Sequence, residues 1–580
     1  MKEANLWRAA REGPEPKELT EKVFTPKCKI PVLDKYEAEV YPEEYWDCWP
    51  VKKLEDSKVE TWVKPEELQA LCWEVGIRTD FGQAKVVLSD LKFGADLGAT
   101  GRSRLASLGP NSRLALLHGE KVQDTIGAFV KKGIYVGPMK LEEAKALGPL
   151  KVHPITAREK ADGSVRVITD ASYPYDAPAG EDSEEPASLN ENINKKDFPV
   201  KMDGMDVFLE QLEDEGRGAM LAKEDLTDAY KHIPVRWEDW RLQAMAWGDR
   251  LFVDTRLMFG TSSSAGIFDR FDALLLQIAV MLSKISKRKA MRFLDDVYGV
   301  ESRHGKRLEG FLHSYRVVCD RVGAKLDPRK RVPPATSTTI LGIEFDTVEW
   351  SWKISEEKAR KIFDKILAAD TTQGTLKERQ SLVGSIMTLI PMMPDARVRF
   401  AELVNYMGNG RTWNLQMSNF WKMVVKRAAT GGDIQVPRQW LPGDCLEVHP
   451  DAAGPQESFL GRGIGLMISD GRWGFLPYPW WMGQEPKFYS PVMLNGTWVD
   501  FRHKMSFLEA IGPLWALVEL GNQATGRTVL AHVDNIGVHY AHVRGYSLNC
   551  PFLNAVMQAT TVVARGLGAR LKIRHINRWK

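Results

Sequence analysis

Two adjacent aspartates, Asp295 and Asp296, lie inside an apolar run and have the spacing of a metal-binding pair. The apolar residues 291–294 and 297–300 on either side predict a β-hairpin with the aspartates at its tip. Neighbouring carboxylates repel each other, and their burial is costly unless a cation neutralises them. Asp225 lies seventy residues upstream, in a second strand-like stretch, and supplies a third carboxylate.

Carboxylates that converge from different strands suit hard cations such as Mg²⁺, which are held by one or two protein oxygens and by substrate phosphates. Two such ions about 3.5–4 Å apart activate a 3′-hydroxyl and stabilise the leaving pyrophosphate. We therefore expect Asp225, Asp295 and Asp296 to bind two Mg²⁺ ions, for which Mn²⁺ could substitute, and to catalyse nucleotidyl transfer. An Asp-Asp pair alone is most often a solvated turn, so this prediction depends on the accompanying motifs.

A charged hairpin precedes the aspartates. Residues 154–170 have the pattern of strand, Asp-Gly turn and strand, with Lys160 and Arg166 on its two arms. These cations could neutralise an incoming triphosphate and hold it in line for attack. A charged hairpin by itself is usually only structural.

A loop of small residues follows Asp225. Phe259 and Gly260 are followed by Ser-rich sequence and then by an amphipathic run, which predicts a loop that opens a helix. Small residues would let a base pair and a template backbone approach closely. The alternative interpretation is a Ser-rich helix N-cap.

These motifs occur in the order of the fingers and palm motifs of reverse transcriptases, which the chain resembles over about residues 85–580. The resemblance is greatest to the reverse transcriptase/RNase H region of DIRS-type, tyrosine-recombinase retrotransposons, or to proteins derived from one. The stretches that carry this likeness are 128–138, Asp170–Pro174 with Ser188–Glu191, and Asp225–Val235 with Trp247-Gly248. Ile340–Ile343 resembles the primer grip that ends this series.

The resemblance implies a role for several of these residues. Asp225 and Asp295 would ligate both metals, with Asp296 as the weaker third member. Tyr230 would lie beneath the incoming sugar, where its ring excludes a 2′-hydroxyl and selects deoxynucleotides. Tyr or Phe at this position is also compatible with ordinary packing.

Further positions match the family less strictly. Phe259 and Gly260 would line the nucleotide pocket, and Lys330 matches a late palm lysine. Phe293 stands where many relatives have Tyr, which keeps the aromatic ring. The acidic segment 178–186 is an insertion relative to the usual pattern.

The C-terminal third has a second ordered set of carboxylates. Asp451 follows a strand-like run, Glu509 begins a helix-like run, and Asp534 closes a strand-like run. One carboxylate on each of three core elements would suit two Mg²⁺ ions that activate water against a phosphodiester. This set resembles an RNase H domain. The sequence ends before the helix that bears a fourth Asp in that family, so we expect this domain to be truncated or to have lost a ligand.

The fold class expected is α/β (α+β), a right-hand polymerase followed by an RNase H-like domain. The expected divisions are an N-terminal extension of unknown role (1–85), fingers and lead-in (86–205), palm (206–350), helical thumb or connection (351–435) and an RNase H-like domain (443–580). A Pro- and Gly-containing linker at 436–443 separates the last two.

The composition is that of a folded protein, with 44% hydrophobic and 27% charged residues among 580. The net charge of +3 does not by itself imply nucleic-acid binding. Residues 351–440, however, carry fourteen Lys or Arg and eight Asp or Glu, a surplus of six that could track a phosphate backbone.

The six cysteines show no C-x-x-C spacing, which argues against a zinc knuckle or a disulfide framework and for a reducing compartment. The N-terminus lacks a signal-peptide pattern, and no run approaches 18 apolar residues. We expect a cytoplasmic or nuclear protein that is neither secreted nor inserted in a membrane.

The function expected is RNA-directed DNA polymerisation, with an RNA template, a DNA primer or RNA/DNA hybrid, and dNTPs as partners. The alternative is a domesticated, non-polymerising descendant that binds nucleic acid or a protein. An RNA-dependent RNA polymerase is disfavoured by Tyr230, since such an enzyme must admit a 2′-hydroxyl.

Overall fold

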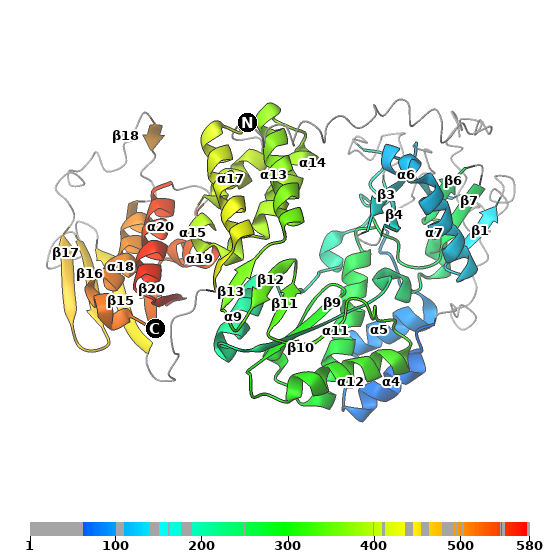
Figure 1. The fold of residues 1–580 in the computed structure, drawn as a ribbon, viewed down its shortest axis with the longest axis horizontal. Coiled ribbons are helices and arrows are strands. Elements are labelled where there is room, and N and C mark those ends of the chain that lie inside the picture. Colours follow the sequence, from blue (N-terminus) through cyan, green and yellow to red (C-terminus); the bar gives the residue numbers. More distant parts are fainter. Residues whose placement is uncertain are drawn as a thin grey trace. The chain divides into compact units, whose positions relative to one another are not determined.

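The fold is taken from a computed structural model of the chain (Figure 1). The structure describes residues 62–99, 110–139, 150–160, 163–175, 188–248, 250–397, 399–408, 412–434, 445–453, 463–477, 492–494, 497–499, 504–545, 547 and 551–576. The acidic insertion at 178–186, the linker at 436–443 and most of the predicted N-terminal extension lie outside these residues.

The chain divides into two compact units. The first unit comprises Met1–Asp203, Ala222–Gly299 and Gly305–Pro334, and the second comprises Gly204–Leu221, Val300–His304 and Ala335–Lys580. The division passes through the predicted palm, whose boundaries therefore stay a prediction.

A four-stranded sheet with the order β10-β5-β9-β8 holds the predicted catalytic carboxylates. Its strands are β5 (Met220–Asp225), β8 (Ala290–Phe293), β9 (Asp296–Glu301) and β10 (Val332–Ala335). Strands β8 and β9 form the predicted antiparallel hairpin, in which Phe293 pairs with Asp296. Leu294 takes a left-handed backbone conformation (φ 54°) in the two-residue turn, the conformation that such tight hairpins require.

Two long helices, α11 (Ser264–Ser283) and α12 (Arg307–Val322), pack against each other, and α11 contacts β8 (Figure 1). Their shared face is aromatic, with Phe268, Phe271, Phe311 and Tyr315 all fully buried. Helix α4 (Pro65–Glu74) packs on α12, and α5 (Gly82–Phe93) packs on α11. The described part of the N-terminal extension is therefore integrated into the first unit.

A further part of the first unit is built on a hairpin and a small sheet. Its helices are α6 (Arg113–Leu117), α7 (Gly119–Lys131) and α10 (Trp237–Trp240). Its strands are β1 (Tyr135–Met139), β2 (Val152–His153), β3 (Ile155–Glu159), β4 (Val165–Thr169), β6 (Ala244–Trp247) and β7 (Arg250–Asp254). Helix α9 (Met205–Glu215) belongs to the second unit. Strands β3 and β4 form the predicted charged hairpin, and β1-β7-β6-β2 form a sheet. Helix α7 buries Val122 and Ile126 against the hairpin residues Ile155 and Val167.

The second unit contains a small sheet followed by a helical region. The sheet has the order β11-β12-β13-β14, formed by Ser337–Ile340, Ile343–Asp346, Ser351–Lys353 and Gly432–Asp433. The helices are α13 (Glu356–Thr371), α14 (Leu376–Met387), α15 (Pro394–Arg397), α16 (Phe400–Met407) and α17 (Leu415–Thr430). These helices lie within residues 351–435, which the sequence predicts to be helical.

The C-terminal sheet has five strands in the order β17-β16-β15-β20-β21. These strands are β15 (Cys445–Ala453), β16 (Gly463–Ile468), β17 (Trp473–Pro477), β20 (Thr528–Val533) and β21 (Arg570–His575). The first three pair antiparallel, whereas β15-β20 and β20-β21 pair parallel. Helices α18 (Lys504–Leu520), α19 (Ile536–Arg544) and α20 (Pro551–Gly566) accompany the sheet, and a small β18-β19 hairpin (Val492–Leu494, Thr497–Val499) completes the described elements.

This strand order and mixture of directions are those of an RNase H-like domain. Together with the hairpin-bearing sheet of the first unit, they confirm the mixed α/β class, with polymerase-like and RNase H-like parts. Among the described helices, none is both long and apolar enough to cross a membrane.

A buried ion pair supports the strand that leads into the catalytic turn. The guanidinium of Arg292, on β8, lies 2.6 Å from Asp269 and 3.9 Å from Asp272, both on α11. Tyr315 on α12 donates a hydrogen bond of 3.0 Å to Asp272. Burial, which outweighs the effect of Arg292, raises the pKa of Asp272 to about 7. The hairpin and both helices thus share one network of buried charges.

We predict that Arg292→Met lowers the free energy of unfolding by about 3–5 kcal/mol, because it leaves buried carboxylates without their cation. Arg472→Met is the matched control, since Arg472 lies at the same 2.6 Å from Asp470 but both side chains are substantially exposed. The control should leave stability nearly unchanged. Chemical denaturation of both variants checks this, and equal effects would contradict it.

Candidate active site

The fold brings the three predicted aspartates together. Asp225 ends β5, while Asp295 and Asp296 occupy the tip of the β8–β9 hairpin. The backbone N–H of Leu226 donates a hydrogen bond of 3.1 Å to the carbonyl oxygen of Asp295. This bond joins the end of one strand directly to the turn of the other two, so that the carboxylates share one edge of the sheet.

The site holds more negative charge than it neutralises. Burial raises the pKa of Asp225 to about 7. The hydrogen bond from Lys330 opposes this rise, and repulsion from Asp295 adds to it. Burial and then the neighbouring Asp296 raise the pKa of Asp295. Oδ1 of Asp296 is buried and accepts no hydrogen bond from the described residues, and Lys223 Nζ lies 3.6 Å away.

Lys330 is a second lysine beside these carboxylates. Its Nζ donates hydrogen bonds of 2.9 and 3.0 Å to the two oxygens of Asp225. Although burial lowers the pKa of Lys330, the hydrogen bond and attraction to Asp225 raise it overall. The N–H of Asp327 also donates a bond of 2.9 Å to the Asp225 carbonyl, which fixes the lysine-bearing loop to the end of β5.

This donor set fits a divalent cation. Buried carboxylates with raised pKa values and an oxygen without a hydrogen bond are the arrangement that Mg²⁺ or Mn²⁺ stabilises. In the described structure, however, one carboxylate oxygen from each of Asp225, Asp295 and Asp296 cannot be chosen so that all three oxygens lie within 4.8 Å of one another. If an ion binds here, these carboxylates would have to come closer together, and it would compete with Lys330 for Asp225.

Tyr230 and Phe259 form an aromatic surface associated with the aspartates. Their ring centroids are 4.8 Å apart, and Tyr230 also contacts Phe268 edge-on at 5.7 Å. Tyr230 lies in the 3₁₀ helix Ala229–His232, which begins after Asp228 in a left-handed conformation. The guanidinium of Arg166 lies 4.7 Å from the centre of the Phe259 ring. The predicted residues of the nucleotide pocket are therefore neighbours.

Gly260 allows the loop to approach the hairpin. Its φ is +113°, and a Cβ at this position would overlap the carbonyl oxygen of Thr169, the last residue of β4. The N–H of Thr169 donates to the Phe259 carbonyl at 3.0 Å. Asn190 secures the same loop, because its side-chain amide donates to the Gly260 carbonyl at 2.9 Å and accepts from the Ser262 N–H at 2.7 Å.

Lys160 lies at the tip of the same hairpin. It begins the turn, in which its N–H donates to Ser164 at 2.8 Å, and it is exposed. Its contact with a triphosphate stays a prediction.

The RNase H candidates lie on three neighbouring elements. Asp451 is exposed near the end of β15, Glu509 is buried in α18, and Asp534 directly follows β20. The register pairs Val448 with Ala531, and its continuation places Asp451 level with Asp534. In the part of the chain that the structure describes, no choice of one oxygen from each of these three carboxylates brings all three within 4.8 Å of one another. Their nuclease role stays a prediction.

Sequence reasoning missed three features of these sites. It assigned no role to Asn190, which secures the Gly260 loop, or to Lys223, which lies beside Asp296. Lys223 precedes Asp225 by two residues on a strand, so the period of two could have placed both on one face. It also missed a cluster of two histidines and a glutamate on the C-terminal sheet.

No protein-family model matches the sequence, and no curated protein matches it. Solved structures that it resembles include the foamy viral protease-reverse transcriptase dRH in complex with double-stranded DNA, at 14% identity and a TM-score of 0.43, covering 89% of this chain and 83% of that chain. The same protease-reverse transcriptase in complex with an RNA/DNA hybrid matches at 13% identity and a TM-score of 0.43, covering 88% of this chain and 63% of that one. These likenesses concern the fold and not the activity.

We predict that Gly260→Ala loosens the junction between the loop and the charged hairpin, because the added methyl group overlaps the Thr169 carbonyl. Hydrogen–deuterium exchange should rise at residues 165–169 and 259–262. Gly163→Ala is the matched control, since Gly163 also has a positive φ (+78°) but a Cβ there meets no described atom within 4 Å. Equal exchange in the two variants would show that backbone strain alone, and not the overlap, matters at Gly260.

Proposed function

We propose that this protein is an RNA-directed DNA polymerase that extends a primer on an RNA or DNA template. The observation that supports this most strongly is the joining of Asp225 to the Asp295-Asp296 turn through the Leu226–Asp295 hydrogen bond. This arrangement concentrates three carboxylates at the edge of a sheet that a polymerase-like fold presents to its substrates. The excess negative charge supports two bound Mg²⁺ ions as cofactors.

Asp225 and Asp295 would hold both ions, and Asp296 would complete the set. When bound, the ions would lower the pKa of the primer 3′-hydroxyl and neutralise charge on the leaving pyrophosphate. Lys330, released from Asp225, would remain beside the site as a cation able to contact a phosphate oxygen.

The remaining residues would position the nucleotide. The rings of Tyr230 and Phe259 form a wall that a sugar could pack against, and the Tyr230 ring would exclude a 2′-hydroxyl, which supports dNTPs as substrates. Arg166 packs against Phe259, an arrangement that would restrict its guanidinium and favour contact with a triphosphate. Lys160, exposed at the hairpin tip, would add a second cation.

The strand order of the C-terminal sheet supports a second candidate activity, hydrolysis of RNA in an RNA/DNA hybrid. Asp451, Glu509 and Asp534 would be its carboxylates. The alternative to both activities is a domesticated protein that binds nucleic acid or a protein partner and no longer polymerises.

The test is primer extension on poly-rA with an oligo-dT primer, dTTP and Mg²⁺ or Mn²⁺. We predict extension by the native protein and a loss of at least about a hundredfold with Asp295→Asn/Asp296→Asn, since several kcal/mol of transition-state stabilisation depend on the ions. Asp320→Asn, which removes an exposed charge on α12, should retain full activity. It controls for the loss of an acidic side chain away from the proposed site.

A native protein that binds the primer-template but extends it with neither ion would contradict the proposal and favour the domesticated alternative. Extension that survives the double substitution would show that other residues hold the ions. A poly-dA template in parallel distinguishes RNA-directed from purely DNA-directed synthesis.

A further inference from the structure

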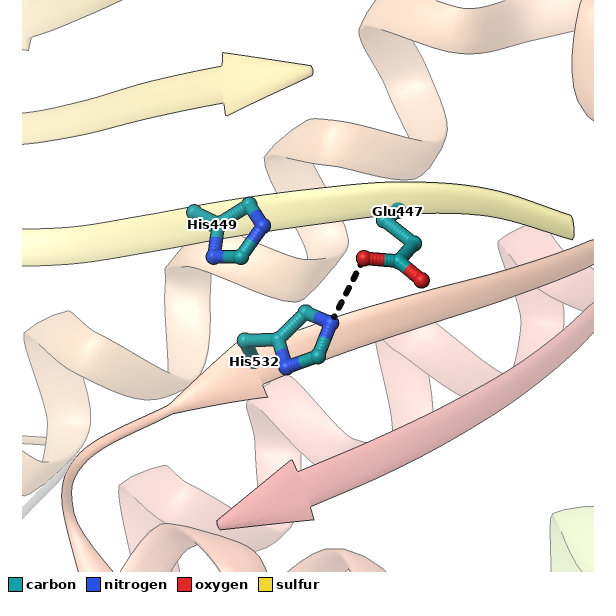
Figure 2. A group of neighbouring side chains, drawn as sticks. All are labelled: Glu447, His449 and His532. Atoms are coloured by element: carbon teal, nitrogen blue, oxygen red, sulfur yellow. Dashed lines mark ion pairs between the residues drawn. The ribbon is translucent and has the colours of Figure 1, made fainter. Parts of the chain in front are cut away.

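Three side chains with metal-ligand chemistry meet on the C-terminal sheet (Figure 2). Glu447 and His449 lie two residues apart on β15, so both project from the same face of the strand. His532 lies on the adjacent parallel strand β20, and the Val448–Ala531 pairing places it level with His449. Two neighbouring strands thus direct two imidazoles and a carboxylate to one point.

The geometry of this cluster is compact. One ligand atom from each residue lies within 4.8 Å of the other two. The imidazole rings of His449 and His532 are stacked, with centroids 4.4 Å apart and planes only 4° from parallel. Figure 2 shows the two rings next to each other, with the Glu447 carboxylate directed toward His532.

His532 is the buried member of the cluster. Its side chain is 7% exposed, and its Nε2 makes no hydrogen bond with the described residues. The nearest acidic oxygen is Oε2 of Glu447, at 3.3 Å. Burial of a ring nitrogen without a hydrogen bond costs free energy, and a ligand at this nitrogen would offset that cost.

We propose that Glu447, His449 and His532 bind a transition-metal ion of the Zn²⁺ class. Imidazole nitrogens suit Zn²⁺ and its neighbours in the first transition series, whereas Mg²⁺ prefers oxygen ligands. Two histidines and one glutamate are also a known zinc ligand set that leaves the fourth position to water or to another ligand. Zinc lies about 2.0–2.1 Å from an imidazole nitrogen and in the plane of the ring, so the near-parallel rings of His449 and His532 would reorient to share one ion.

This site is separate from the carboxylates of the proposed polymerase and does not depend on the proposed function. It lies close in sequence to two of the RNase H candidates, since His449 precedes Asp451 on β15 by two residues and His532 precedes Asp534, which follows β20, by two residues. A metal bound there would link strand β15 to strand β20. It would therefore stabilise this sheet in the folded protein by mass action.

The competing explanation is an ion pair without metal. A protonated His532 beside Glu447, with His449 stacked on it, would form a small charged cluster that needs no ligand. The two explanations differ in the number of metal ions bound per chain and in the absorption spectrum of the protein with Co²⁺.

The test uses the full chain, stripped with a chelator and titrated with Co²⁺ and with Zn²⁺ in a millimolar excess of Mg²⁺, which saturates the oxygen-rich sites. We expect one equivalent of Co²⁺ to give visible d–d absorption and to be displaced by Zn²⁺. X-ray absorption of the Zn²⁺ form should show nitrogen and oxygen ligands with imidazole scattering and no sulfur.

Glu447→Gln and His449→Gln should each weaken this binding at least tenfold. Glu447 is exposed and His449 is half-buried, so these variants are expected to fold even where His532→Asn does not. His313→Gln, which removes an exposed histidine from α12, is the matched control and should bind as the native protein does. Circular dichroism verifies the fold of each variant.

Binding that is unchanged in both Glu447→Gln and His449→Gln would overturn the proposal, because the ion would then lie elsewhere. Absence of any Co²⁺ or Zn²⁺ binding to the native protein would overturn it as well and leave the ion pair as the explanation. A sulfur ligand in the absorption spectrum would assign the ion to cysteine instead.

Discussion

The close placement of three partly buried carboxylates at the end of β5 and the β8–β9 turn is the constraint that the surrounding structure must satisfy. Asp225, Asp295 and Asp296 are held together by backbone pairing, not by mutual attraction, and the Leu226–Asp295 bond fixes their separation. Burial first, and repulsion from a neighbouring aspartate in addition, raises the pKa of Asp225 and of Asp295. Lys330 offsets part of this rise. The site is therefore built to accept positive charge.

The surrounding structure maintains this unfavourable cluster. Arg292 anchors β8 to α11 through a buried ion pair, immediately before the turn. Leu294 occupies a left-handed conformation that an L-residue adopts only at a cost, and such strain is often stored at functional sites. The Phe259 loop is bonded to the hairpin that carries Arg166 through Thr169, and Asn190 bonds the same loop at Gly260. These contacts hold the proposed nucleotide-binding residues next to one another.

Local patterns in the sequence predicted the elements well. The apolar runs around Asp295 specify the hairpin because a period of two and a two-residue turn leave few alternatives. The Lys160–Arg166 hairpin and the helix after Gly260 follow from similar local signals.

What the sequence did not predict depends on register between distant strands. Nothing local places His532 beside His449, or Asn190 on the Gly260 loop, because these contacts arise only when separate segments pair. The direct bonds from Lys330 to Asp225 were likewise not predicted, although the lysine itself was noted.

The central claim is that these aspartates form a divalent-cation site for which Lys330 competes. The most direct measurement is electron paramagnetic resonance of Mn²⁺ binding to the nucleotide-free protein at mildly alkaline pH. The account predicts that Lys330→Met binds Mn²⁺ more tightly than the native protein, while Asp225→Asn binds it more weakly and the exposed-lysine control Lys361→Met is unchanged. Mn²⁺ binding that is unaffected by Asp225→Asn, or weakened by Lys330→Met, would contradict it.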